Sequence, residues 1–332
     1  MAEAAAIPLL VRLLAYHDDD TNSLAACALG NIAVDSIHNC ELVLAVANVI
    51  PSIRALCTKD ASIERIRIGT WLLHILSDCQ SQPAFSLLQS ALPVVVQLLS
   101  SYSDEEVLQN VCCTLMNFSA TSEQVQSVID SGVTCRLIEL LSHQSDRVQY
   151  PALCTIHNIT TDVVQSQAII DCGGLPLLRV LLTLPEPEIY NKTCGVILNI
   201  ISRNKAHIEH VIGAGIIPKV VAILQEKDTI ENQKAAAQAI SYIACNGSNE
   251  QVRYLAEQGV ISPLCELIFD CAESILSVGV VDSQSNGNGR NVFADQVRKC
   301  GGHDFLHSLR AHELEEVRLR AKHILSMYFQ TS

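Results

Sequence analysis

Four asparagine residues recur in one short sequence pattern and could hold an extended polypeptide by its main chain. The segments CALGNIAVD, CTLMNFSAT, CTIHNITTD and GVILNIISR contain Asn31, Asn117, Asn158 and Asn199. A side-chain amide offers both a donor and an acceptor, the two kinds of group with which a peptide backbone pairs. A single asparagine in a helix more often satisfies a neighbouring helix, but four in one register favour a binding role.

The pattern returns at a steady interval along the whole chain. Two variants, WLLHILSDC and QAISYIACN, place Ile75 and Tyr242 at the asparagine position, and the steps are then 44, 42, 41, 41 and 43 residues. A second signature, led by proline in ALPVVVQLL and GLPLLRVLL, repeats with the same period. Self-similarity at this period indicates a solenoid built from helical repeats.

Each repeat is predicted to contain three helices. A short segment such as 124–132 ends at glycine, a common helix stop, and proline suits the first turn of the second helix. The third helix has apolar residues at helical spacing and opens with acidic residues, as at 18–20, 104–106 and 186–188, which we interpret as helix starts and not as metal sites. The prediction is an all-α, armadillo-repeat, right-handed superhelical solenoid with the third helices on its inner surface. We expect one domain over 1–332, with about eight repeats of roughly 42 residues, the first and last incomplete.

Composition restricts the class of partner. The net charge of −13 argues against nucleic acid and favours a basic partner, although an acidic surface also serves solubility. The 14 cysteines include no Cys-x-x-Cys pair and no zinc-ligand spacing, so we expect unpaired thiols in a reducing compartment and no metal. No leader opens the chain and no apolar run reaches membrane-spanning length, which predicts a soluble intracellular protein without a membrane partner.

Enzymatic chemistry has no support in the sequence. No nucleophile elbow or dinucleotide-binding loop occurs, and His74 and His157 stand alone within repeat helices. We therefore expect neither catalysis nor a cofactor. The segment VDSQSNGNGRNVF, which contains glycines, lacks the preceding strand and following Lys-Ser/Thr of a phosphate cradle, so 282–291 is predicted to be a flexible loop.

Several segments resemble the importin-α family. CALGNIAVDS is similar to the family's Trp-Ala-Leu-Gly-Asn-Ile-Ala-Gly-Asp-Ser, and QVQSVIDSGVTCRLIELLSHQSDRVQYPAL and FLHSLRAHELEEVRLRAKHILSMYF resemble other family segments. The resemblance covers about 3–330 and follows the order of the repeats. It implies a nuclear import adaptor of the cytoplasm and nucleus, which binds the basic localisation signals of cargo proteins with tryptophan–asparagine pairs on its third helices.

The resemblance also implies a set of binding residues. Asp35 matches the carboxylate that fixes the key lysine of a signal, and only Trp71 keeps the tryptophan; the other tryptophan places are Cys27, Cys113, Cys154, Gly195 and Gln238. Lys192, three residues before one of these places, would repel a basic ligand. The predicted peptide-binding residues are Asn31, Asp35, Trp71, Asn117, Asn158 and Asn199.

Two readings of the altered array stay open. Loss of several cation–aromatic contacts would cost on the order of 2–5 kcal/mol, which predicts an adaptor with weakened or altered cargo choice. The alternative is a protein–protein scaffold that has lost signal binding, favoured by cysteine and glycine at the tryptophan places. The resemblance further implies contact of the C-terminal repeats with the family's export receptor. The basic arm that binds importin-β has no counterpart here, so coupling by that route is not expected.

Overall fold

The structure is a computed structural model whose described residues are helices, turns and short connections. It describes 2–16, 18–79, 86–122, 124–225, 230–265, 291–299, 301–313 and 315–329, with single positions between 267 and 280. Within these ranges no β-strand occurs, which agrees with the predicted all-α class. The predicted loop at 282–291 lies outside the described residues, except for its last position.

The chain divides into two compact units, Met1–Ala214 and Gly215–Ser332. The division falls within one repeat, between helix α15 (His207–Gly213) and helix α16 (Ile217–Gln225). The single domain expected from the repeats stays a prediction.

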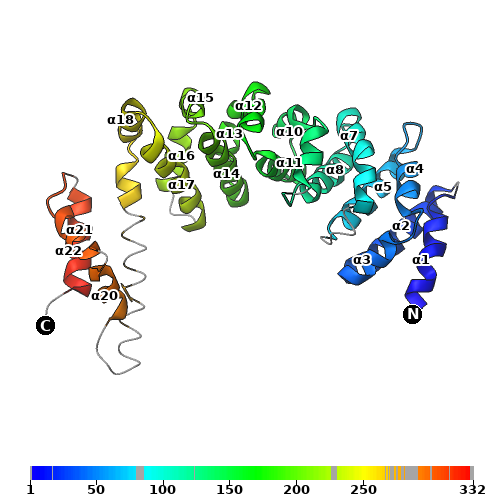
Figure 1. Ribbon diagram of the computed structural model, residues 1–332, viewed down its shortest axis with the longest axis horizontal. Helices are drawn as coiled ribbons and strands as arrows, with labels where there is room; N and C mark the ends of the chain where they lie inside the picture. Colours follow the sequence, from blue (N-terminus) through cyan, green and yellow to red (C-terminus); the bar gives the residue numbers. More distant parts are fainter. Residues whose placement is uncertain are drawn as a thin grey trace. The chain divides into compact units, whose positions relative to one another are not determined.

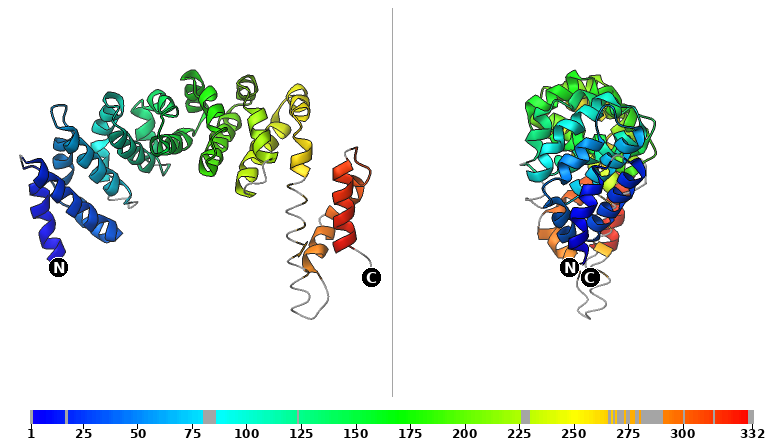
Figure 2. Two further views of the ribbon diagram at one scale, coloured as in Figure 1. Left: turned by 180° about the vertical axis from the view of Figure 1, so that it is seen from behind. Right: turned by 90° about the vertical axis from the view of Figure 1, so that its right-hand side faces the viewer.

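The third helices form the central row of the first unit. They are α2 (Asp19–Asp35), α5 (Ile63–Ser77), α8 (Glu105–Phe118), α11 (Asp146–Ile159) and α14 (Pro187–Arg203). Each packs against the next, and Figures 1 and 2 show α5, α8, α11 and α14 in succession. The shorter helices of this unit are α1 (Ala2–Leu13), α3 (Ile37–Leu44), α4 (Val49–Leu56), η1 (Gln89–Ala91), α7 (Leu92–Ser101), α9 (Val125–Asp130), α10 (Thr134–Leu140), α12 (Val163–Asp171), α13 (Gly174–Leu181) and α15.

Acidic residues start the third helices, as predicted. Asp18 accepts a hydrogen bond from Thr21 N, and Asp104 accepts one from Val107 N, so each carboxylate satisfies an N–H group that the helix leaves unpaired. Asp104 also receives the Arg67 guanidinium at 2.6 Å, which ties α5 to the start of α8.

Glycine and proline mark the boundaries of the shorter helices. Gly132 and Gly173 lie between a first and a second helix with φ of 73° and 76°, in the left-handed region that favours glycine. Pro93 and Pro176 lie in the first turns of α7 and α13, as expected. Pro8 is the exception, because α1 begins at Ala2 and encloses it.

Each third helix buries apolar residues, and α2 also hydrogen-bonds to the end of the helix before it. In α8 the buried residues include Val107, Val111 and Phe118, at the predicted spacing. Near the start of α2, the buried Asn22 donates through Nδ2 to the carbonyl oxygens of Leu13 and Leu14, at 2.9 and 3.2 Å. The start of α2 therefore provides a donor for carbonyl groups at the end of α1.

The second unit contains fewer described elements. They are α16, α17 (Ile230–Asn246), α18 (Asn249–Glu257), α20 (Val292–Lys299), α21 (Gly302–Leu309) and α22 (Glu315–Tyr328). A hydrophobic core joins the last of these helices and includes Phe269, Leu306, Ile324 and Phe329.

Two cysteines correct the expectation of unpaired thiols. Cys135 of α10 and Cys172, which caps α12, form a disulfide with their Cα atoms 5.2 Å apart. The prediction was wrong for this pair because the two cysteines belong to successive repeats, so no local spacing motif shows that they meet. Ten other described cysteines form no disulfide, and six of them are buried.

Among the described residues, no group of three or more His, Cys, Asp or Glu side chains could hold a metal ion. No single described helix is both long and apolar enough to cross a bilayer, although two sharply bent helix pairs reach that length and composition when joined.

Candidate functional site: the third-helix face

The asparagines of α8 and α11 are half-buried and are anchored by the preceding third helix. Asn117 donates from Nδ2 to the Ser77 hydroxyl at 3.0 Å, and Asn158 donates to the Ser119 hydroxyl at 3.2 Å. Each serine hydroxyl donates its own proton to a carbonyl group three residues earlier in its helix. The hydroxyl oxygen therefore accepts from the asparagine, and each amide is held in one orientation.

Asn199 of α14 follows the same arrangement with a different acceptor. Its Nδ2 lies 3.4 Å from the carbonyl oxygen of His157, in the preceding third helix. The side chain is half-buried, like those of Asn117 and Asn158. The three asparagines thus occupy equivalent positions on consecutive packed helices.

These bonds use only part of each amide. One of the two Nδ2 protons is engaged, and among the described residues no donor reaches Oδ1 of Asn117 or of Asn199. Oδ1 of Asn158 lies 3.4 Å from Nδ1 of His157. These asparagines therefore do bond to a neighbouring helix, as a lone asparagine would. In Asn117 and Asn199 this leaves Oδ1 and one Nδ2 proton for a ligand.

The two predicted site residues at the end of α2 are both exposed. The side chain of Asn31 makes no hydrogen bond to the described part of the chain. Asp35 accepts a hydrogen bond of 2.9 Å from Nδ2 of Asn39 and keeps its second oxygen in solvent. A carboxylate in this state can receive a cation without first breaking a buried ion pair.

The only tryptophan lies against the glycine that precedes Asn31. Trp71 of α5 is half-buried, and a β-carbon built on Gly30 would stand 2.4 Å from Cη2 of its indole ring. The ring is therefore wedged between α2 and α5 beside the first asparagine, where one part of it stays accessible.

His157 and Gly195 contact each other in the same way, but here the ring belongs to the earlier helix and the glycine to the later one. Gly195 occupies a tryptophan place on α14, and a β-carbon there would stand 3.0 Å from two atoms of the His157 ring. In both pairs, the residue before an asparagine meets the tryptophan place of the next repeat. Gly30 accommodates Trp71, whereas His157 fills the space that Gly195 leaves.

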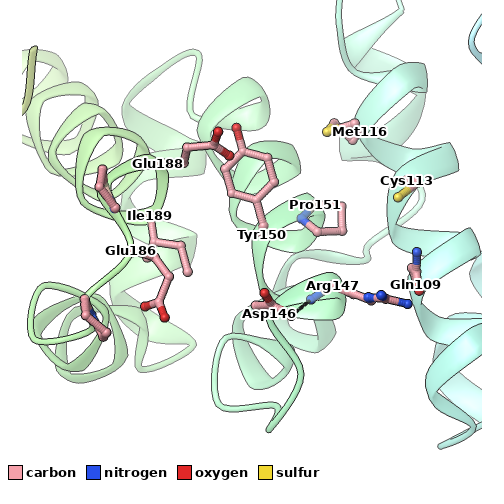
Figure 3. Close-up of a pocket in the computed structure, with 12 residues that line it drawn as sticks. Gln109, Cys113, Met116, Asp146, Arg147, Tyr150, Pro151, Glu186, Glu188 and Ile189 are labelled. Atoms are coloured by element: carbon pink, nitrogen blue, oxygen red, sulfur yellow. Dashed lines mark hydrogen bonds between the residues drawn. The ribbon is translucent and has the colours of Figure 1, made fainter.

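A pocket of about 610 Å³ opens between α8, α11 and α14 (Figure 3). Its apolar wall includes Met116 and Pro151, and it also exposes Cys113, whose small thiol occupies a tryptophan place. Its charged groups are Asp146, Arg147, Glu186 and Glu188. Figure 3 shows the two glutamates on the α14 side and Arg147 reaching toward Gln109 on the α8 side.

The α14 side of this pocket is negative. The carboxylates of Glu186 and Glu188 lie there, and one oxygen of Glu186 is buried with no hydrogen-bond donor in the described structure. Burial raises the pKa of Tyr150 to about 12, with Cys154 and the Glu188 carboxylate acting in the same direction. This side therefore favours a cationic group with an apolar stem.

Lys192 introduces the opposite charge one turn further along α14. Burial lowers the pKa of His157, and the Lys192 ammonium lowers it further. Burial also raises the pKa of Cys154, an effect that Lys192 opposes. The cation therefore acts on the same stretch of the face as Asn158, where it would repel a basic side chain.

The last pair of predicted positions lies on α17 in the second unit. Gln238 at the tryptophan place is exposed, and Tyr242 at the asparagine place is half-buried. Neither side chain could provide the tryptophan–asparagine combination of the importin-α family.

The fold and the row of asparagines define an armadillo-repeat protein. The Armadillo/beta-catenin-like repeat family matches residues 121–161. A designed armadillo repeat protein in complex with the peptide (KR)4 is similar to the chain with a TM-score of 0.63 and 26% identity, over 71% of this chain and 98% of the designed one.

Two plant proteins give the more specific relationship. Importin subunit alpha-8 of Arabidopsis thaliana is 34% identical over 96% of this chain and 74% of its own length. Importin subunit alpha-1b of Oryza sativa subsp. japonica is 35% identical over 99% of this chain and 64% of its own length. The chain belongs to the importin-α family, and it spans about 64% of the rice relative. Importin-α and armadillo-repeat proteins are not enzymes, in agreement with the sequence prediction.

Proposed function

We propose that this chain is a nuclear import adaptor that binds basic localisation signals on its third-helix face. The observation that carries the proposal is the row Asn117, Asn158 and Asn199, whose amides are oriented by the preceding helices while their remaining polar atoms stay available. Amides held in place beforehand lose little side-chain freedom on binding, which favours the capture of an extended main chain.

Side-chain selection would begin near α2 and α5. The accessible part of Trp71 would pack against the stem of a lysine, and Asp35 would receive its ammonium group. The negative side of the pocket, at Glu186 and Glu188, would accept a second cationic side chain.

The same face would bind basic signals more weakly than an intact tryptophan array. Cys113, Cys154 and Gly195 supply no aromatic wall, and Lys192 places a cation near Cys154 and His157. Each missing cation–aromatic contact would cost about 0.5–2 kcal/mol. The adaptor would therefore prefer signals whose basic residues are grouped toward α2 and α5.

The transport partners belong to the same proposal. Basic signal-bearing proteins would be the cargo, the C-terminal repeats would contact the family's export receptor, and the protein would move between cytoplasm and nucleus. An interaction with importin-β is not part of this proposal.

The second candidate function is a protein–protein scaffold without signal binding. The observation that favours it is the pair His157 and Gly195, because the imidazole fills the space left at a tryptophan place. On a third-helix face that is filled in this way, the asparagines would serve only to hold neighbouring helices together.

A titration separates the two candidates. Fluorescein-labelled (KR)4 is titrated with the protein at about 150 mM salt, and its anisotropy is compared with that of a Gly/Ser peptide of equal length. The adaptor predicts micromolar binding of the basic peptide alone. Asn117→Ala and Asn158→Ala should each weaken binding by about twofold to tenfold, and Asp35→Lys should remove most of it.

The controls decide what a loss of binding means. Asn249→Ala changes an exposed asparagine of α18 in the second unit and should leave binding unchanged. Circular dichroism of each variant checks that the helices persist. No binding of (KR)4 at any workable concentration, or equal binding by Asp35→Lys, would reject the adaptor in favour of the scaffold.

A further inference from the structure

The second unit contains a basic pocket that the third-helix face does not use. Its volume is about 520 Å³, and it lies between α21 and α22. Leu325 and Phe329, both buried, form the apolar floor. The polar lining consists of His303, His307, Arg310, Lys322 and Ser326. Among the described residues no carboxylate lines this pocket, in a chain whose net charge is −13.

Ring contacts hold several of these side chains in place. The imidazole centroids of His303 and His307 are 4.6 Å apart, and His303 lies 5.2 Å from the Phe329 ring. The Cζ atom of Arg298, on α20, also lies 5.2 Å from the Phe329 centroid. Three helices thus bring donor groups toward one apolar ring.

Two of the cations have no counter-charge among the described residues. Asp304 lies 3.5 Å from Nδ1 of His303 but is 93% exposed, and Asp295 pairs with Arg298 at 3.1 Å. No described carboxylate comes within 4.0 Å of Arg310 or Lys322. Two uncompensated cations beside two imidazoles create a positive potential that an anion would relieve.

His307 can provide a further hydrogen-bond donor in this pocket. Nη1 of Arg310 lies 3.5 Å from Nδ1 of His307, and a guanidinium can only donate. In the tautomer in which Nδ1 accepts from this guanidinium, Nε2 of His307 carries the ring proton and can donate it to a ligand. This contact leaves the other guanidinium donors of Arg310 free for a ligand.

We propose that this pocket binds a phosphate monoester. Guanidinium and ammonium groups recognise phosphate oxygens from several directions, and a phosphate dianion has enough acceptors to pair with both cations and an imidazole. The apolar floor suits the chain that carries the phosphate, so a phosphorylated serine of a partner protein matches the pocket better than the free ion. This site does not depend on peptide binding by the first unit.

The test uses the full chain and a labelled peptide. A fluorescein-labelled peptide, Ala-Ala-phosphoserine-Leu-Ala, is titrated with the protein by anisotropy at about 150 mM salt, beside the same peptide with serine or glutamate in place of phosphoserine. We expect the phosphopeptide to bind at least about tenfold more tightly than either, and inorganic phosphate to compete at higher concentration.

Substitutions assign the binding to this pocket. Arg310→Gln combined with Lys322→Gln should weaken phosphopeptide binding at least about tenfold, whereas Lys219→Gln, an exposed cation of α16 in the same unit, should not. Both substituted side chains are exposed, so the double variant should keep its helical circular dichroism. Equal affinity for the serine and phosphoserine peptides, glutamate binding as tightly as phosphoserine, or an unchanged double variant would each overturn the proposal.

Discussion

The indole ring of Trp71 lies over Gly30 so closely that a β-carbon at residue 30 would stand 2.4 Å from Cη2. The two residues belong to successive third helices, α2 and α5, and they meet beside Asn31. Because Trp71 is the only tryptophan of the chain, its fluorescence reports on this contact alone.

Gly30→Ala should displace the indole ring and loosen the contact between α2 and α5. Overpacking of this kind costs about 1–3 kcal/mol, so we expect a lower free energy of unfolding and red-shifted tryptophan emission. Gly213→Ala is the matched control, because no atom lies within 4 Å of a β-carbon built there. Equal emission spectra for Gly30→Ala and the unmodified protein would show that the ring does not need this glycine.

Lys192→Glu should strengthen the binding of (KR)4, since it removes a cation that acts on His157, the residue before Asn158, and adds a carboxylate. Charge changes at exposed or half-exposed sites are worth a few tenths to about 1 kcal/mol, so we expect an increase of roughly twofold to fivefold. The pKa of His157 should rise at the same time, because Lys192 is one of the causes that lower it. Anisotropy and imidazole NMR titration measure the two effects.

The control for this prediction is Lys219→Glu, which makes the same change of net charge at an exposed residue of α16. An equal gain in affinity for both variants would assign the effect to overall charge and not to Lys192.

Asp104→Asn should destabilise the protein at neutral pH but not in strong acid. The Arg67 hydrogen bond holds the pKa of Asp104 below its ordinary value of 3.8. A carboxyl group whose pKa is lowered by folding contributes stability above that ordinary value, and the contribution disappears as the pH falls through the lowered pKa. Asparagine is also a good helix cap, so the substitution removes the charge and keeps the cap of α8.

Melting temperatures between pH 7 and pH 2.5 would test the Asp104 prediction, with the difference between variant and parent shrinking below about pH 4. Glu105→Gln serves as the comparison, because it neutralises an exposed neighbour in the first turn of α8. A difference for Asp104→Asn that stays constant over this pH range would contradict the assigned cause.

Reduction of the Cys135–Cys172 disulfide should lower the stability of the oxidised protein. A crosslink between residues 37 positions apart restricts the unfolded chain, and removal of such a bond costs about 2–4 kcal/mol. Cys135→Ser should melt at the temperature of the reduced parent, whereas Cys245→Ser, at an exposed free cysteine, should still respond to reductant. Alkylation and mass spectrometry of the oxidised protein must find both thiols blocked; free thiols at both positions would refute the pairing.

Local sequence was sufficient for the helices and for the position of the asparagines. Helix starts at Asp18 and Asp104 and the stop before Gly132 follow from groups that each helix leaves unpaired within a few residues. The repeat period then placed Asn117, Asn158 and Asn199 at equivalent positions. The prediction that proline lies in the first turn of a helix was wrong for Pro8, because helix α1 begins at Ala2 and encloses this residue.

A weaker signal in the sequence could have revealed the anchoring of the asparagines. Ser77 and Ser119 each stand two residues after an asparagine place, and each accepts from the asparagine of the next repeat. Ala33 occupies that position before Ile75, where neither the hydroxyl nor the asparagine is present. Pairs of this kind are visible only when successive repeats are compared with one another.

By itself the sequence determined an acidic array of three-helix repeats with amides in register, because helix periodicity, capping and turn preferences act over a few neighbouring residues. Only the tertiary structure decided that Trp71 covers Gly30, that Cys135 meets Cys172, and that α21 and α22 enclose a basic pocket. These contacts join residues from different helices, often about one repeat apart. They depend on side-chain volume and on the exact approach of packed helices, which no single segment specifies.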